Sequence, residues 1–204
     1  MVTNVSNPLS GAPVRNRPPF SVYLGLFFLL LCINTLLAKF AVFSFAVAPG
    51  VSSFYIVVVL MIVFAIWFGM WGAVAAYVGC FVGAGLLSGI PMDVSLYWSL
   101  SDFWQALIPL LAFRYFHVDP ALTGRRDLLI VLLFGVLLNN LCGALWGSLT
   151  LALGGVIPWN TVGSAMYAWW LGNIIVCLVL LPPVLYLFTP FVRSHELFIR
   201  AYWT

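Results

Sequence analysis

The chain has 204 residues, of which 64% are apolar and only 6% are Asp, Glu, Lys or Arg. Because water-soluble domains carry about 25% charged residues, this composition excludes a soluble globular protein. The apolar residues form blocks of about 20, the length that spans the hydrocarbon core of a bilayer. We therefore expect an all-α, polytopic membrane protein with no soluble catalytic or nucleic-acid-binding module.

The chain is expected to begin with a tail and continue as six helices. Residues 1–20 are rich in Pro, Ser and Asn, which predicts a disordered cytoplasmic tail. The next block, from Ser21 to about Phe43, is too long for the apolar part of a secretory signal and predicts the first span. Residues 21–190 are thus predicted to form one transmembrane domain, and residues 191–204 a short cytoplasmic tail. The five further spans are expected at residues 52–69, 71–90, 95–116, 128–153 and 166–189.

The arginines predict the orientation, because positively charged residues in short loops stay cytoplasmic. Six crossings leave both termini on one side, and a cytoplasmic N-terminus makes every basic residue except Lys39 cytoplasmic. The net charge of +3 fits contact with anionic membrane lipids and requires no nucleic acid. We expect a multi-pass protein of the inner (cytoplasmic) membrane.

Polar side chains inside the apolar blocks are candidates for a binding site, because each is costly in hydrocarbon. The fourth span is the most polar, and we expect its polar face to point into the bundle. A spacing of three to four residues forms that face from Ser95, Trp98, Asp102, Gln105 and Pro109. Lys39 lies at a similar depth to Asp102, so an ion pair between them is sterically allowed. In the alternative, Lys39 reaches the outer headgroups and Asp102 bonds to the backbone or to Ser101.

The fifth and sixth spans add asparagines and tryptophans to this region. The same spacing groups Asn139 with Gly143, Trp146 and Thr150, with Asn140 beside them, whereas Asn173 lies one turn from Trp169 and Trp170. Their convergence in the outer half would form a small-molecule site. The alternative is that the asparagines only bond between helices, at about 0.6 kcal/mol each. The candidate ligand-binding residues are Lys39, Trp98, Asp102, Gln105, Asn139, Trp169 and Asn173.

Other patterns predict packing more than chemistry. Small residues at Gly72, Ala76, Gly79 and Gly83 form a stripe on the third span that predicts close helix contact. The four cysteines lie within apolar blocks without metal-ligand spacing, so we expect them to be buried and predict no metal site. Since HExxH, GxSxG and P-loop motifs are absent, the chain is predicted not to be an enzyme. The sequence names no cofactor.

The sixth span contains the motif Trp169-Trp170-Leu171-Gly172-Asn173, followed by Leu181-Pro182-Pro183. These residues resemble the Trp-Trp-x-Gly-Asp and the later Leu-x-x-Pro of the membrane-associated sensor domains of bacteria, of the MASE type, with Asn173 in place of the usual Asp. The resemblance runs from about Pro49 to Pro190. The resemblance implies a helical sensory bundle that recognises a ligand. Its signal is expected to pass to a separate membrane or signalling protein.

Two other functions also fit the sequence. The substrate-capture subunits of energy-coupling-factor vitamin transporters are similar in length and in having six helices. In that case, the small-residue stripe of the third span would dock the transporter scaffold. The third function is that of an accessory structural subunit of a larger membrane complex.

Overall fold

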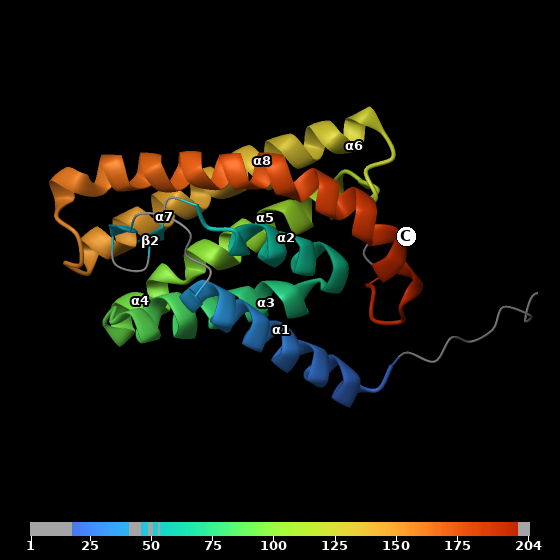
Figure 1. Cartoon of the computed structure of the whole chain (residues 1–204), viewed down its shortest axis with the longest axis horizontal. Helices are drawn as coiled ribbons and strands as arrows, with labels where there is room; N and C mark the ends of the chain where they lie inside the picture. The colour runs from blue at the N-terminus through green and yellow to red at the C-terminus, as the bar shows by residue number, and fades with distance from the viewer. Residues whose placement is uncertain (1–17, 41–45, 49–50, 53, 200–204) are drawn as a thin grey trace, which may run out of the picture.

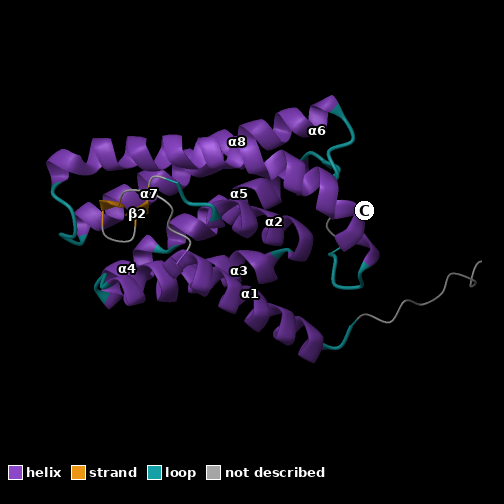
Figure 2. Cartoon of the chain, viewed as in Figure 1, coloured by secondary structure: helices purple, strands orange, loops and turns teal. Residues whose placement is uncertain are grey.

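The structure is a computed structural model that describes residues 18–40, 46–48, 51–52 and 54–199. Helices make up almost all of it (Figures 1 and 2). The helices are α1 (Phe20–Phe40), α2 (Val57–Phe68), α3 (Met70–Cys80), α4 (Met92–Trp98), α5 (Leu100–Tyr115), α6 (Arg125–Ile130), α7 (Asn139–Leu153) and α8 (Val162–Ser194). The strands β1 (Ala46–Ala48) and β2 (Val51–Ser52) pair antiparallel.

Several helices continue through turns of other winding. A π-helical segment, Phe81–Gly85, and a 3₁₀ turn, Leu86–Ser88, extend α3. The π-helical segment Val131–Leu138 joins α6 to α7, and the 3₁₀ turn Trp159–Thr161 leads into α8. With these extensions, four helical segments within the described residues are long and apolar enough to cross a membrane, which indicates a membrane protein. They are Phe20–Phe40, Met70–Ser88, Arg125–Leu153 and Trp159–Ser194.

Connections gather at the two ends of the bundle (Figure 1). The start of α1, the α2–α3 turn, the α5–α6 loop and the end of α8 lie at one end. The paired strands, the start of α4 and the α7–α8 turn lie at the other. Each helical segment therefore runs from one end of the bundle towards the other.

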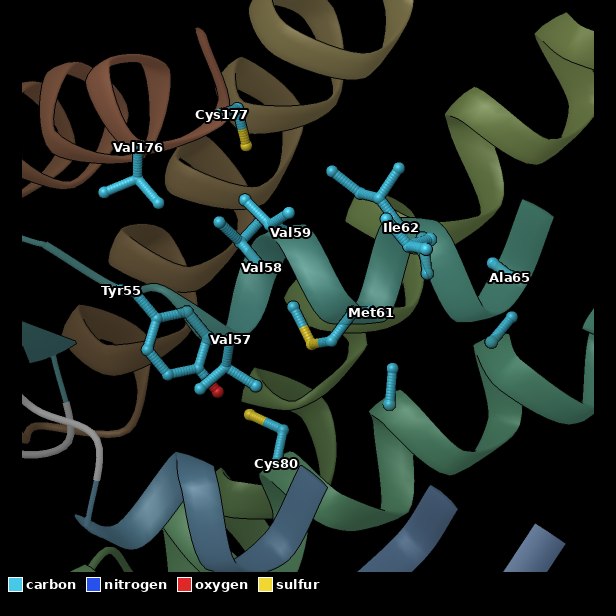
Figure 3. Packing of buried hydrophobic residues seen from close by; sticks show 14 of the residues in the cluster. Tyr55, Val57, Val58, Val59, Met61, Ile62, Ala65, Cys80, Val176 and Cys177 are labelled. Atoms are coloured by element: carbon cyan, nitrogen blue, oxygen red, sulfur yellow. The ribbon is translucent and has the colours of Figure 1, made fainter. Parts of the chain in front are cut away.

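The short helix α2 forms the centre of the bundle. Nine of its twelve residues are buried, and it packs against α3, α5 and α8. Figure 3 shows Val58 and Val59 of α2 opposite Val176 and Cys177 of α8. A helix that is apolar on every side is stable only when other elements surround it. At 1.5 Å per residue α2 is about 18 Å long, less than the ~30 Å hydrocarbon core.

The expected spans differ most from the observed helices in three places. The second helix begins at Val57 instead of residue 52, because β2 occupies Val51–Ser52. The fourth is broken at Ser99, whose hydroxyl donates to the Ser95 carbonyl at 2.5 Å, a local bond that competes with regular helix. The sixth continues to Ser194. The expected N-terminal tail lies outside the described residues except for its last three positions.

Helix α1 is held by the small-residue stripe of α3. Its buried residues recur every fourth position, at Leu26, Leu30, Asn34 and Ala38. A methyl group on Gly79 would lie 2.5 Å from Cβ of Asn34, and one on Gly83 would lie 2.5 Å from the Thr35 carbonyl oxygen. These glycines therefore let two helices touch directly, and the prediction of close packing is confirmed.

Hydrogen bonds join the loop between α5 and α6 to the end of α8. Arg193 forms an ion pair with Asp119, and the Thr189 hydroxyl donates to the Pro120 carbonyl at 3.0 Å while accepting from Trp67 Nε1. Partial burial raises the pKa of Asp119, but the hydrogen bonds from Arg193, from the Ala121 N–H and from Thr123, together with the charge of Arg193, outweigh the effect of burial, and the pKa falls below its usual value. We call Trp67, Asp119, Pro120, Thr189 and Arg193 the α8 clasp.

The cysteine prediction is half wrong. Cys80 and Cys177 are buried, but Cys32 and Cys142 are exposed on the outside of the bundle. That surface is covered by large apolar side chains such as Phe28 and Leu29, as expected for a surface in contact with lipid. Because cysteine is itself a small hydrophobe, lying in an apolar block does not predict which side of a helix it faces.

We expect Gly79→Ala to lower the free energy of unfolding by about 1–3 kcal/mol, because its methyl group would overlap Cβ of Asn34 and crowd the Asn34 backbone. The measurement is the thermal unfolding midpoint in detergent. The control is Gly25→Ala on α1, where a methyl group meets nothing within 4 Å. Equal midpoints for the two variants would contradict the close α1–α3 contact.

Candidate binding site in the bundle interior

The polar face of α4 and α5 points into the bundle, as the sequence predicts. Trp98, Asp102 and Gln105 are each at most 2% exposed. The polar face continues across the break at Ser99, because α5 begins at Leu100 and runs in nearly the same direction as α4 (Figure 1). The residues of this face nevertheless meet different partners on three other helices.

Gln105 joins α5 to α7 through side-chain amides. Its Nε2 donates to Asn140 Oδ1 at 2.7 Å, and Asn139 Nδ2 donates to the Gln105 backbone carbonyl at 3.3 Å. Asn140 Nδ2 in turn donates to the Val136 carbonyl at 2.8 Å and to Cys177 Sγ on α8 at 3.4 Å. Asn140, which the sequence places only beside the site, is thus the residue that links all three helices.

Glycines on α7 make room for this network and for a tryptophan pair. A methyl group on Gly143 would lie 2.5 Å from Gln105 Cγ and Cδ. One turn further, a methyl group on Gly147 would overlap the Trp169 ring and lie 3.3 Å from Trp98 Nε1. The rings of Trp98 and Trp169 are 6.0 Å apart between centroids and tilted by 56°. Two predicted site residues from different helices are therefore in contact.

The contacts between α7 and α8 place Asn173 at the level of Gln105. Asn140 lies opposite Cys177, and Gly147 lies opposite Trp169. Asn173 is halfway between Trp169 and Cys177, four residues from each, so all three share a face of α8. Asn173 therefore lies at the same height in the bundle as Gly143 of α7, the glycine against which the Gln105 side chain packs.

Several polar atoms in this region are buried without a hydrogen-bond partner in the described structure. Since a buried polar group without a partner costs about 1–3 kcal/mol, each of these atoms calls for an explanation. Together they offer both donors and acceptors but no charge. The atoms are Trp98 Nε1, Gln105 Oε1, Asn139 Oδ1, Ser148 Oγ, and Nδ2 and Oδ1 of Asn173.

Two predicted site residues, Lys39 and Asp102, lie outside this cluster of amide and indole side chains. Lys39 Nζ donates to the Leu87 carbonyl at 2.5 Å and forms no ion pair with Asp102 among the described residues, so that pairing is not observed. Asp102 accepts from the Ser101 hydroxyl at 3.4 Å, as the alternative predicted, and also from the Tyr55 hydroxyl at 3.3 Å. Tyr55 was not predicted, because an isolated tyrosine in an apolar block carries no signal of its partner.

The expected face of the fifth span is partly wrong. Trp146 is exposed, and its Nε1 donates to the Tyr97 carbonyl at 2.8 Å. With Thr150 it lines an apolar groove of about 450 Å³ between α4 and α7, which also includes Asp93. The buried face instead contains Gly143, Gly147 and Leu151. The four-residue spacing of the two glycines was the available signal in the sequence.

Five of the seven predicted site residues form a packed polar core, and these are Trp98, Gln105, Asn139, Trp169 and Asn173. None of the seven lines this groove or a second one, of about 440 Å³, at the start of α6. No group of three or more His, Cys, Asp or Glu side chains suited to a metal ion occurs in the described part of the chain. The chemistry that the arrangement offers is hydrogen bonding to an uncharged polar group.

No protein-family model matches the chain, and neither a curated protein nor a solved structure matches it significantly. The resemblance to membrane-associated sensor domains and the similarity to transporter subunits therefore stay predictions.

We expect Gly147→Ala to separate the Trp98–Trp169 pair and to lower stability by about 1–3 kcal/mol, because the buried Trp169 ring has no free space to enter. The measurements are near-ultraviolet circular dichroism and the unfolding midpoint. Gly163→Ala on α8, where a methyl group meets nothing within 4 Å, is the control. An unchanged aromatic spectrum in Gly147→Ala would show that the two rings do not pack on this glycine.

Proposed function

We propose that the chain is an integral membrane sensor-like protein that recognises a small, uncharged polar ligand between α5, α7 and α8. The observation that carries this proposal is the set of buried unpartnered polar atoms on Trp98, Gln105, Asn139 and Asn173. A ligand with donors and acceptors of its own would satisfy these groups, and the absence of charge among them favours a neutral molecule.

Ligand binding at this place requires a movement of the helices. Gln105 rests on Gly143, and Trp169 rests on Gly147, so no space for a ligand separates these side chains. A ligand that bonds to Asn173 must therefore move α8 relative to α5 and α7. Because the other end of α8 carries the α8 clasp, such a movement would reach the α5–α6 loop, where a separate signalling protein could detect it.

The transporter alternative receives less support from the packing. It requires the small-residue stripe of α3 as a docking face for a scaffold subunit. Gly79 and Gly83 are covered by α1, and a methyl group on Gly72 would overlap the Phe64 backbone of α2. The stripe is thus used within the chain, which favours the sensor and the accessory-subunit functions.

We also propose six crossings with both termini cytoplasmic. The support is that Arg114, Arg125 and Arg193 all lie near one end of the bundle, the end where α8 finishes (Figure 1). In this arrangement α2 and the α4–α5 segment cross in addition to the four long segments.

Fusions to a reporter that is active only outside the cytoplasm test the topology. Six crossings place Gly89 and Gly155 outside and Gly69 and Gly124 inside, so fusions after the first two residues should be active and fusions after the others inactive. If only the four long segments crossed, with the N-terminus cytoplasmic, Gly89 would be cytoplasmic. An inactive Gly89 fusion would therefore contradict the proposal.

The ligand is tested by purifying the full chain from its native membrane in mild detergent and identifying bound molecules by mass spectrometry. We expect a neutral polar molecule, and we expect Asn173→Ala to weaken its binding about tenfold to thirtyfold, since two hydrogen bonds of about 1 kcal/mol each are lost. Because the Asn173 amide has no partner without ligand, the same change should leave the stability of the empty protein unchanged or raised.

The matched control is Asn160→Ala, an exposed asparagine at the start of the α8 segment, which should bind normally. A protein that carries no small molecule and co-purifies in fixed ratio with a larger complex would overturn the sensor proposal and establish the accessory-subunit function. Binding that is unaffected by Asn173→Ala would place the ligand elsewhere.

A further inference from the structure

Asp102 is the one buried acid of the five in the chain. Its side chain is 1% exposed, whereas Asp93 and Glu196 are exposed and Asp119 and Asp127 are partly exposed. It lies on α5, in the first turn after the break at Ser99, and faces the start of α2. A carboxylate in the interior of a membrane bundle is costly unless a positive charge neutralises it.

No side-chain cation neutralises Asp102 in the described structure. The Lys39 ammonium group is turned to the Leu87 carbonyl at 2.5 Å. Arg114 is on the same helix but twelve residues away, about 18 Å along the axis at 1.5 Å per residue. The titratable groups that face Asp102 from neighbouring elements are the Tyr55 hydroxyl before α2 and the Cys80 thiol of α3, both of which are neutral donors. Figure 3 shows these two side chains pointing towards one another.

The hydrogen bonds to Asp102 do not replace a missing cation. The hydroxyl donors are Tyr55, 3.3 Å from Oδ2, and Ser101, 3.4 Å from Oδ1, and the Cys80 thiol is a third, intrinsically weak donor. A hydroxyl that donates to a carboxylate normally lies about 2.5–2.7 Å from it. The cluster therefore holds the side chain in place but leaves the negative charge largely uncompensated.

We propose that Asp102 is a proton-binding site of the membrane domain. A proton from water forms an O–H bond at one carboxyl oxygen and returns to water when the site empties, so no other reactant is needed. A proton requires no cavity, which fits a side chain that lines neither of the two grooves. The protonated carboxyl group can donate to the Ser101 or Tyr55 oxygen, which reverses one of the present hydrogen bonds.

The proton would act on α2 through Tyr55. Tyr55 is 8% exposed and stands two residues before α2, the helix that contacts α3, α5 and α8. Its hydroxyl bonds to Asp102 of α5. The protonation state of Asp102 therefore decides which hydrogen bond fixes the start of α2. This inference does not depend on the proposed ligand, because the groups that it uses are not among the unpartnered amides of α7 and α8.

Infrared difference spectroscopy of the full chain in lipid, between acidic and neutral buffer, tests the proposal. We expect the C=O stretch of a protonated, buried carboxyl group that titrates as one proton. Asp102→Asn, which keeps the shape and the acceptor, should abolish this band. Asp93→Asn, which changes an exposed acid, should leave the band intact.

A second variant guards against a misfolded Asp102→Asn protein. Tyr55→Phe keeps the ring packing but removes the donor to the charged form, so it should keep the band and move its titration to higher pH. A band that persists in Asp102→Asn, or that no acidification produces while the protein stays folded, would overturn the proposal. A carboxylate stretch that responds to replacing Na⁺ by choline, and not to pH, would also overturn it by showing a metal-ion site.

Discussion

The apolar helix α2 constrains where every polar group of the bundle can lie. Its twelve residues carry no hydrogen-bonding side chain except Trp67 at its end, and that indole bonds to Thr189 in the α8 clasp. The polar side chains of α5 therefore cannot find partners along α2 itself. Asp102 turns to Tyr55, just before the helix begins, and Gln105 turns away from it to α7. The polar core thus lies on the side of the bundle that α2 leaves open.

Glycines determine how closely the helices meet on that side. Gly143 and Gly147 bring α7 against the side chains of Gln105 and Trp169, and so the amide and indole groups are packed with no room for a ligand. The energetic cost of unpartnered polar atoms is then balanced by dense packing around them. A ligand that relieves this cost has to open the packing, which couples recognition to a displacement of α8.

The sequence predicts the helices and the buried face of α5 because both follow from periodicity. Trp98, Asp102 and Gln105 lie three to four residues apart, and all are buried. It does not predict partners, because these depend on the rotation of one helix against another. The spacing groups Trp146 on one helix face with Asn139, yet a small difference in the rotation of α7 points Trp146 outwards to Tyr97.

The surroundings of a short helix are also not predicted by the sequence. The apolar block at residues 52–69 predicts a span, but only the neighbouring helices show that α2 is enclosed on every side. The break at Ser99 is also invisible to hydropathy, since it arises from one hydroxyl that bonds to the Ser95 carbonyl. That break separates α5 from α4, and α5 contributes one residue to each proposed site, with Asp102 and Gln105 one turn apart. Since Asp102 is bonded towards α2 and Gln105 towards α7, a rotation of α5 that favours one contact strains the other. The proposed proton and the proposed ligand would then influence each other through the orientation of this one helix.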